Sequence, residues 1–113
     1  MSKYNAVISY SDGIRFASKK EMYRYNELQL LVKAGEIGDL KLQVKYPLVV
    51  NDIKICDYCC DFEYLDYRTM KTITEDSKGV KTPVYRLKCK LMKAIHGIDI
   101  LGSNGDMFVT EMI

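Results

Sequence analysis

The chain is poor in histidine and proline, has no tryptophan, and contains no long apolar run. It has one histidine (His96) and two prolines in 113 residues, and its formal net charge is only +2. A single histidine argues against nuclease chemistry that depends on histidine as the proton carrier. No apolar run approaches the roughly 20 residues of a membrane span, and residues 1–4 do not begin a signal peptide. We therefore expect a cytoplasmic protein that does not enter a membrane.

Length and composition are those of one soluble domain. Hydrophobic residues make up 48% of the chain and charged residues 28%, which is ordinary for a globular protein. We expect a single domain over residues 1–113, long enough to bury a core. No repeat, low-complexity tract or linker divides it. The tail over residues 102–113 has no clear pattern, and we expect part of it to be disordered.

Cysteine is present in a spacing that raises the question of a metal site. Cys56 and Cys59 form a C-x-x-C pair, followed by Cys60 and an isolated Cys89. A structural zinc site usually takes two spaced pairs of ligands, and only Cys89 and His96 could complete this one. We favour the alternative, in which reduced cysteines pack in a sheet. Strand alternation then puts Cys56 and Cys60 on one face and Cys59 on the other.

The first third of the chain predicts a hairpin and a helix. A strand over residues 4–9, a turn at Asp12-Gly13 and a return strand over 14–16 form the hairpin. A helix follows from Ser18 to about Ala34, where a glycine ends it.

The rest of the chain predicts an antiparallel meander followed by a helix and a last strand. The expected elements are strands over 41–50, 53–65 and 71–77, a helix over 83–96 with Thr82 as its N-cap, and a strand over 98–101. Pro47 predicts an edge position or a bulge. The order is αβββαβ after an N-terminal β-hairpin, an α/β (α+β) fold with a mixed sheet.

The first helix carries an acid on its inward side. Tyr25, Leu28 and Val32 form an apolar stripe, and Glu21 lies one turn earlier on the same stripe. Glu21 also stands three residues after Ser18, the spacing of a capping box. The sequence leaves both roles open, a helix cap and a member of a site.

The second helix separates an apolar stripe from a basic row. The stripe is Val84, Leu87, Leu91 and Ala94 or Ile95. Residues 78–93 hold six basic residues and no acid, and a row of them lies on one helix face. Such a row is either a solvated surface or a surface for nucleic-acid phosphates. The residues assigned to DNA contact are Lys81, Arg86, Lys90 and Lys93.

Two acids and a lysine close the second and third strands of the meander. Asp61 lies near the end of one, and Asp76 and Lys78 share a face at the end of the next. If these ends meet, two carboxylates and an ammonium converge, and the carbonyl of Ser77 adds an oxygen. Carboxylate and carbonyl oxygens are the ligands that Mg²⁺ prefers, and an ammonium can stabilise charge on a phosphodiester. Alternation also puts Glu63 on the face of Asp61.

This arrangement resembles the signature of the PD-(D/E)xK nuclease superfamily. More closely, the chain is similar to a family of small phage and prophage proteins, long described only as a domain of unknown function and assigned to that superfamily. The similarity covers about residues 10–100, with cysteine at position 60 where the motif name has proline. The segments that carry it are Gly13–Glu21, Leu42-Gln43, Tyr46–Leu48, Asp61–Tyr64, Glu75–Gly79 and Thr82–Lys88.

The resemblance implies roles for individual residues. Asp61 corresponds to the first motif acid, Asp76 to the second and Lys78 to the motif lysine. Glu21 is similar to a helix acid that joins the site in phage-type junction resolvases. Gln43 and Glu63 take supporting positions, whereas Glu75 is expected to point to the opposite face from Asp76.

The resemblance implies an Mg²⁺-dependent DNA endonuclease of a phage, with Mn²⁺ as a substitute ion and no small-molecule cofactor. Branched or recombination DNA, such as a Holliday junction, is one expected substrate. Cutting two strands with one site per chain favours a homodimer. Two alternatives stay open. One is a DNA-binding protein that keeps the fold without catalysis, and the other is a small phage regulatory protein that binds a host protein.

Overall fold

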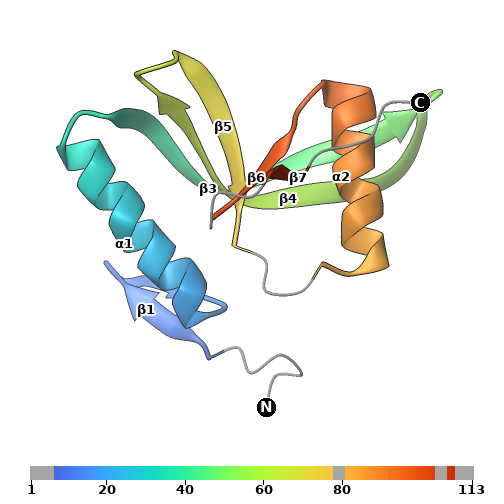
Figure 1. The fold of residues 1–113 in the computed structure, drawn as a ribbon. Coiled ribbons are helices and arrows are strands. Elements are labelled where there is room, and N and C mark those ends of the chain that lie inside the picture. The colour runs from blue at the N-terminus through green and yellow to red at the C-terminus, as the bar shows by residue number, and fades with distance from the viewer. Residues whose placement is uncertain (1–6, 78–80, 104–106, 109–113) are drawn as a thin grey trace.

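The computed structural model of the chain describes residues 7–77, 81–103 and 107–108. It has a small hairpin, two helices and a mixed sheet (Figure 1). The hairpin pairs β1 (Ser9–Ser11) with β2 (Ile14–Phe16) around Asp12 and Gly13, which both have positive φ. The turn and return strand are as predicted. The first strand begins later than the predicted strand over residues 4–9. Residues 1–6, and with them the start of that predicted strand, lie outside the described part.

Helix α1 (Lys19–Lys33) begins and ends where its sequence signals predict. The Ser18 side chain caps it by accepting from the Glu21 amide at 3.2 Å, and Gly35 follows the C-cap with a φ of +75°. Tyr25 and Leu28 are buried, as the predicted stripe requires. The Tyr25 hydroxyl donates to Asp12 at 3.1 Å, which fastens the hairpin to α1.

The main sheet has the strand order β3-β4-β5-β6-β7. The first three strands form the predicted antiparallel meander, and β6 pairs with β5 in parallel after the α2 crossover. Pro47 lies on the edge strand, one residue from a register shift between Leu48 and Val49, as predicted. The strand bounds are β3 (Ile37–Val50), β4 (Ile53–Asp66), β5 (Lys71–Asp76), β6 (Ile100–Gly102) and β7 (Met107–Phe108).

Strand β7 was not predicted. It pairs with β6 in the segment that the sequence suggested as partly disordered. Residues 104–106 and 109–113 of that tail lie outside the described part of the chain.

Helix α2 (Pro83–His96) has the predicted bounds, but a different face is buried. Thr82 caps it through the Tyr85 amide at 3.1 Å, and Gly97 ends it with a φ of +69°. The predicted stripe is wrong at its start, since Val84 and Leu87 are 63% and 56% exposed. Tyr85, Cys89 and Met92 face the sheet instead. The choice of face follows from tertiary contacts at the first turn, which helical periodicity does not specify.

Two hydrophobic clusters fill the molecule, one against each helix. The first packs against α1 and the second against α2, which contains Cys89 and Met92. Cys56 and Cys60 pack with Tyr58 in the second cluster, as the alternation of strand β4 predicted. The buried members are Phe16, Tyr25, Leu28, Ile37, Phe62 and Tyr64 in the first, and Leu48, Tyr58, Cys60, Cys89, Met92 and Ile100 in the second.

Strand β4 changes the face that it presents to each helix along its length. Glu75 and Asp76 are neighbours on β5, so their side chains point to opposite faces; Glu75 contacts α1 and Asp76 contacts α2. The Tyr64 hydroxyl reaches Glu75 and the Tyr58 hydroxyl reaches Asp76. Tyr58 and Tyr64 are six positions apart, which regular alternation would put on one face. The alternation therefore breaks between them.

The break lies at Asp61, opposite a distorted residue of β3. Gln43 has a φ of +54°, and the paired residues on either side are Leu42 with Phe62 and Val44 with Cys60. A positive φ is uncommon for a residue other than glycine and disturbs the regular alternation of side chains, while the pairing keeps the same register on both sides of Gln43. The irregular point of the sheet is thus the place where sequence analysis puts its first acid.

Candidate functional site

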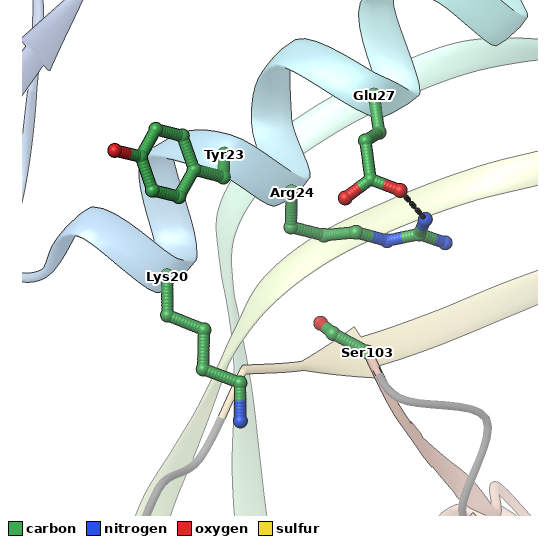
Figure 2. Close-up of a pocket in the computed structure, with 5 residues that line it drawn as sticks. All are labelled: Lys20, Tyr23, Arg24, Glu27 and Ser103. Atoms are coloured by element: carbon green, nitrogen blue, oxygen red, sulfur yellow. Dashed lines mark hydrogen bonds and ion pairs between the residues drawn. The ribbon is translucent and has the colours of Figure 1, made fainter.

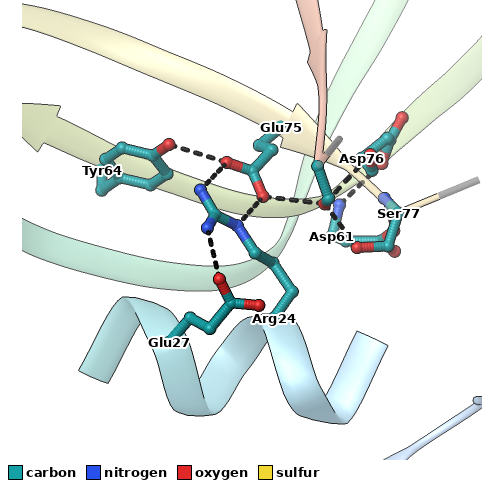
Figure 3. A network of polar contacts seen from close by, with 8 residues as sticks. Arg24, Glu27, Asp61, Tyr64, Glu75, Asp76 and Ser77 are labelled. Atoms are coloured by element: carbon teal, nitrogen blue, oxygen red, sulfur yellow. Dashed lines mark hydrogen bonds and ion pairs between the residues drawn. The ribbon is translucent and has the colours of Figure 1, made fainter. Parts of the chain in front are cut away.

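Asp61, within strand β4, is hydrogen-bonded to the end of strand β5. Its backbone amide donates to Oδ1 of Asp76 at 2.9 Å, and its Oδ2 accepts from the Ser77 amide at 2.8 Å. Its side chain and that of Asp76 are both buried, with the residues 7% and 0% exposed. The two predicted acids therefore lie side by side at the end of β5 (Figure 3).

Glu21 joins this group through the side chain of Gln43. The amide nitrogen of Gln43 donates to Glu21 Oε1 at 3.0 Å and to Asp61 Oδ1 at 3.4 Å. The cap with Ser18 uses the backbone amide of Glu21, so the carboxylate can turn inward at the same time. The two roles that the sequence left open use different atoms of one residue.

Asp76 is held by donors that sequence reasoning missed. The hydroxyls of Tyr58 and Tyr85 both donate to Oδ2, the latter at 2.8 Å. Burial raises the pKa of each tyrosine above 10, and the charge of Asp76 raises it further. Both phenols therefore stay protonated at neutral pH and keep their donor role.

Glu75 is buried on the other face of β5, as predicted, and pairs with α1. Arg24 donates to it through Nε at 2.7 Å and Nη2 at 3.0 Å, a bidentate geometry. The hydroxyls of Tyr64 and Ser103 add bonds at 2.7 and 2.8 Å (Figure 3). The pair raises the pKa of Arg24 above its ordinary value, chiefly through this hydrogen bond. Arg24 lies one turn after Glu21, so the pair fixes α1 against the strand that carries Asp76.

The four basic residues predicted to contact DNA fall into two groups. Lys81, Arg86 and Lys90 are exposed near the first turns, where Tyr85 contacts Asp76. Lys93 lies further along and pairs with Asp99 at 2.9 Å. The first group is therefore the part of the row closest to the acids.

Glu63 lies away from Asp61, contrary to the alternation that the sequence suggested. Its carboxylate accepts from the hydroxyl of Tyr46, a residue of the cluster below α2. The reason is the break at Asp61, which puts Glu63 on the face opposite to Glu21. Lys78, the motif lysine, lies outside the described residues.

Comparison with known families matches residues 1–100 to a family described as protein of unknown function (DUF1064). The chain belongs to this family. Neither curated proteins nor solved structures gave a match. The DUF1064 match covers the site residues from Glu21 to Tyr85 and Lys93 but ends before Ser103.

The donor atoms in this DUF1064 chain suit a hard cation, although they do not form a closed cage. Glu21 and Asp61 offer carboxylates to one amide, and like charges so placed favour a cation nearby. Within the described ranges, no three acidic, histidine or cysteine side chains group as a metal site. Mg²⁺ usually takes only one or two carboxylates, with water and substrate oxygens completing its shell. The pair therefore fits Mg²⁺, and Asp76, enclosed by three donors, is arranged as a support.

The described part of the DUF1064 chain contains two helices, and neither is long and apolar enough to cross a membrane.

One pattern in the sequence pointed to the tyrosine partners of Glu75 and Asp76. Tyr58 and Tyr64 stand at even positions of one strand, but their split between two faces depends on the break in alternation at Asp61, which no local sequence pattern predicts.

Proposed function

We propose that this protein is a metal-dependent DNA endonuclease of the PD-(D/E)xK type. One observation supports it most. Glu21 of α1, Gln43 of β3, Asp61 of β4 and the Ser77 amide after β5 form one hydrogen-bonded group. Ser77 directly precedes Lys78 in the chain. The elements that carry the group follow the order of elements in the superfamily.

The chemistry follows from the residue types. Glu21, Asp61 and the carbonyl of Ser77 would hold Mg²⁺, or Mn²⁺ in its place. The ion would activate a water and neutralise charge on the leaving oxygen of a phosphodiester. Gln43 orients the two carboxylates. Lys78 would stabilise the charge that develops on the phosphate.

Asp76 has a different part in this proposal from the one that its motif suggests. Its two oxygens accept from Tyr58, Tyr85 and the Asp61 amide. It positions the end of β5, and thereby Ser77, relative to Asp61. Coordination of a metal by Asp76 would require these donors to give way.

The biological setting is proposed from the same resemblance. A phage or prophage protein of this type acts in the host cytoplasm on replicating or recombining DNA. Branched DNA is the substrate class that we favour, and a homodimer would supply a second site for the second strand.

The test is cleavage of a labelled panel of linear duplex, single strand, fork and four-way junction with Mg²⁺, Mn²⁺ or EDTA. We expect metal-dependent cutting by the wild type and its loss in Lys78→Ala and Asp61→Asn. Lys78→Ala should keep the thermal unfolding temperature within a few degrees, whereas Asp61→Asn turns an NH₂ group toward the donor of Ser77 or of Gln43 and should be less stable. Cutting that persists in Lys78→Ala at the wild-type rate would reject the assignment.

Asp76→Asn is a poor choice for that control. The single NH₂ group of an asparagine would face either the Asp61 amide or the two tyrosine hydroxyls, and the charge that these donors stabilise would be lost, so the fold itself would suffer. Lost cleavage in this variant would not distinguish catalysis from stability.

The enclosure of Asp76 favours a second candidate function, a DNA-binding protein with this fold and no catalysis. Its affinity would fall steeply with salt, because phosphate contacts dominate. DNA binding without cutting on the panel would support it. Neither binding nor cutting would point to a regulatory protein with a protein partner.

A further inference from the structure

A pocket lies between α1 and the end of β6, beside the candidate site. It has a volume of about 340 Å³ and is lined by Lys20, Tyr23, Arg24, Glu27 and Ser103 (Figure 2). Small-molecule sites begin at about 300 Å³, so the space suits a single small polar unit. Four of the five lining residues come from two turns of one helix, which makes this wall rigid.

The pocket adjoins the site through two residues. Oγ of Ser103 is 2.5 Å from Oγ of Ser77, whose amide holds Asp61. Lys20 precedes Glu21 on α1, and its side chain extends toward the end of β5 (Figure 2). A ligand that extends from the candidate site along α1 would therefore enter this pocket.

The charges in the pocket are arranged for an anion. Arg24 is fixed by its bidentate bonds to Glu75, and its Nη1 makes only a 3.4 Å contact with Glu27. A guanidinium has five N–H groups. Glu75 accepts from two, Glu27 from one and Tyr64 lies within reach of a fourth, so one is left for another acceptor among the described residues. Glu27 has a side chain 63% exposed, so an anion of the ligand can displace it at small cost.

Ser103 is less suited to bind the anion directly. Its hydroxyl donates to Glu75, so its proton is already used. Tyr23, at the rim, is 57% exposed. An exposed aromatic ring is the kind of surface on which a nucleobase stacks. The pocket thus offers cationic donors on one side and an aromatic face on the other.

We propose that this pocket binds one nucleotide of the DNA strand next to the bond that is cut. The phosphate lies between the Lys20 ammonium and the outer edge of the Arg24 guanidinium, and the base stacks on Tyr23. The inference deepens the proposed nuclease function and rests on it. It assigns a second DNA contact, on α1, besides the basic row of α2.

The experiment measures the affinity of a short single-stranded oligonucleotide and of a fork by fluorescence anisotropy, in EDTA and over a range of salt. Lys20→Ala should weaken binding about three- to fivefold, the size of one exposed charge contact, and lower the salt slope by about one. Glu27→Gln should tighten binding by a similar factor because it removes the competing carboxylate. Tyr23→Phe should bind as the wild type does, and Tyr23→Ser should bind more weakly.

Lys33→Ala, an exposed lysine in the last turn of α1, is the matched control and should change nothing. In the cleavage assay, Lys20→Ala should raise KM and leave kcat unchanged. Wild-type affinity in both Lys20→Ala and Glu27→Gln would overturn the pocket assignment, as would absence of DNA binding by the wild type.

A second arm uses inorganic phosphate alone, followed by amide shifts in a two-dimensional NMR spectrum. We expect shifts at Lys20 and Arg24 with both ligands. Saturation by the oligonucleotide at a concentration far below the phosphate concentration that saturates the same shifts would support a strand site. Equal affinity for both ligands would show a free-anion site and overturn the proposal. Because this arm needs no cleavage, a protein that binds in the pocket without cutting would reject the nuclease function and keep the nucleotide site.

Discussion

At the scale of residues, two adjacent buried carboxylates are stabilised in different ways. Glu75 is balanced by a cation, Arg24, with which it forms a bidentate pair. Asp76 is balanced by hydroxyl and amide dipoles from Tyr58, Tyr85 and the Asp61 backbone. A bidentate pair with a cation fixes distance and orientation together and neutralises the charge, whereas hydroxyl and amide dipoles hold Asp76 without a countercharge. Both arrangements therefore fix the end of β5, the first through charge and the second through hydrogen bonds alone.

The Arg24–Glu75 pair should be strongly coupled. Arg24→Met leaves a buried, uncompensated carboxylate and should lower the free energy of unfolding by about 3–5 kcal/mol. Glu75→Gln should also destabilise, yet the double variant should lose less than both single losses combined. Urea denaturation of the four proteins measures this coupling. Additive losses would show that the two side chains do not stabilise each other. Lys33→Met, on the exposed end of α1, is the control.

At the scale of elements, the α2 row should act through its first turns. Arg86→Glu with Lys90→Glu should weaken binding of duplex DNA by about tenfold or more at low salt and reduce the salt slope by about two. Lys93→Glu should have a smaller effect, because Lys93 is already paired with Asp99. Anisotropy titrations at several salt concentrations compare them. A larger effect from Lys93 would place the DNA on the other end of the helix.

The sequence predicted those parts of the fold that local chemistry determines. Ser18 and Thr82 cap their helices through hydroxyl bonds within three residues, and Gly97 ends α2 with a positive φ. Such signals act over one turn and are visible in any window of the chain. The inward position of Glu21 was predicted from the stripe of α1, whereas its place in the site with Asp61 was predicted only from the resemblance to the nuclease superfamily.

What depends on contacts between distant segments could not be foreseen. The buried face of α2, with Cys89 and Met92 in place of Leu87, follows from where Tyr85 meets Asp76. The position of Glu63 follows from the break in alternation at Asp61, opposite Gln43 with its positive φ, where β3 pairs with β4. Periodicity describes one element at a time and carries no information on either.

At the scale of the whole molecule, buried tyrosines link stability to alkaline pH. Burial and neighbouring acids raise the pKa of Tyr58, Tyr64 and Tyr85, and raise that of Tyr46 to about 12. The unfolded chain releases these protons near pH 10, whereas the folded protein keeps them. The stability that they contribute is therefore fully present below pH 10 and lost as the pH rises toward the folded values.

We expect the free energy of unfolding to be level in this respect to about pH 9 and to fall above pH 10. The slope should reach about 1.4 kcal/mol per pH unit for each such tyrosine. Urea denaturation from pH 8 to 11, with phenolate absorbance, checks it. Tyr85→Phe should make the slope shallower, and Tyr10→Phe, at an exposed position, should not. An unchanged slope in Tyr85→Phe would contradict the assignment.

The break in β4 divides the interior into two half-cores on opposite sides of one sheet, each with its own helix. Each half can exchange apolar side chains without disturbing the packing of the other, because the two meet only across the backbone. The exception is the seam itself, where Gln43, Asp61 and the end of β5 belong to both halves. A ligand that bound at this seam would contact both halves. Its binding would therefore raise the free energy of unfolding of the entire fold. Relatives could therefore diverge widely in their cores while the seam stays constrained.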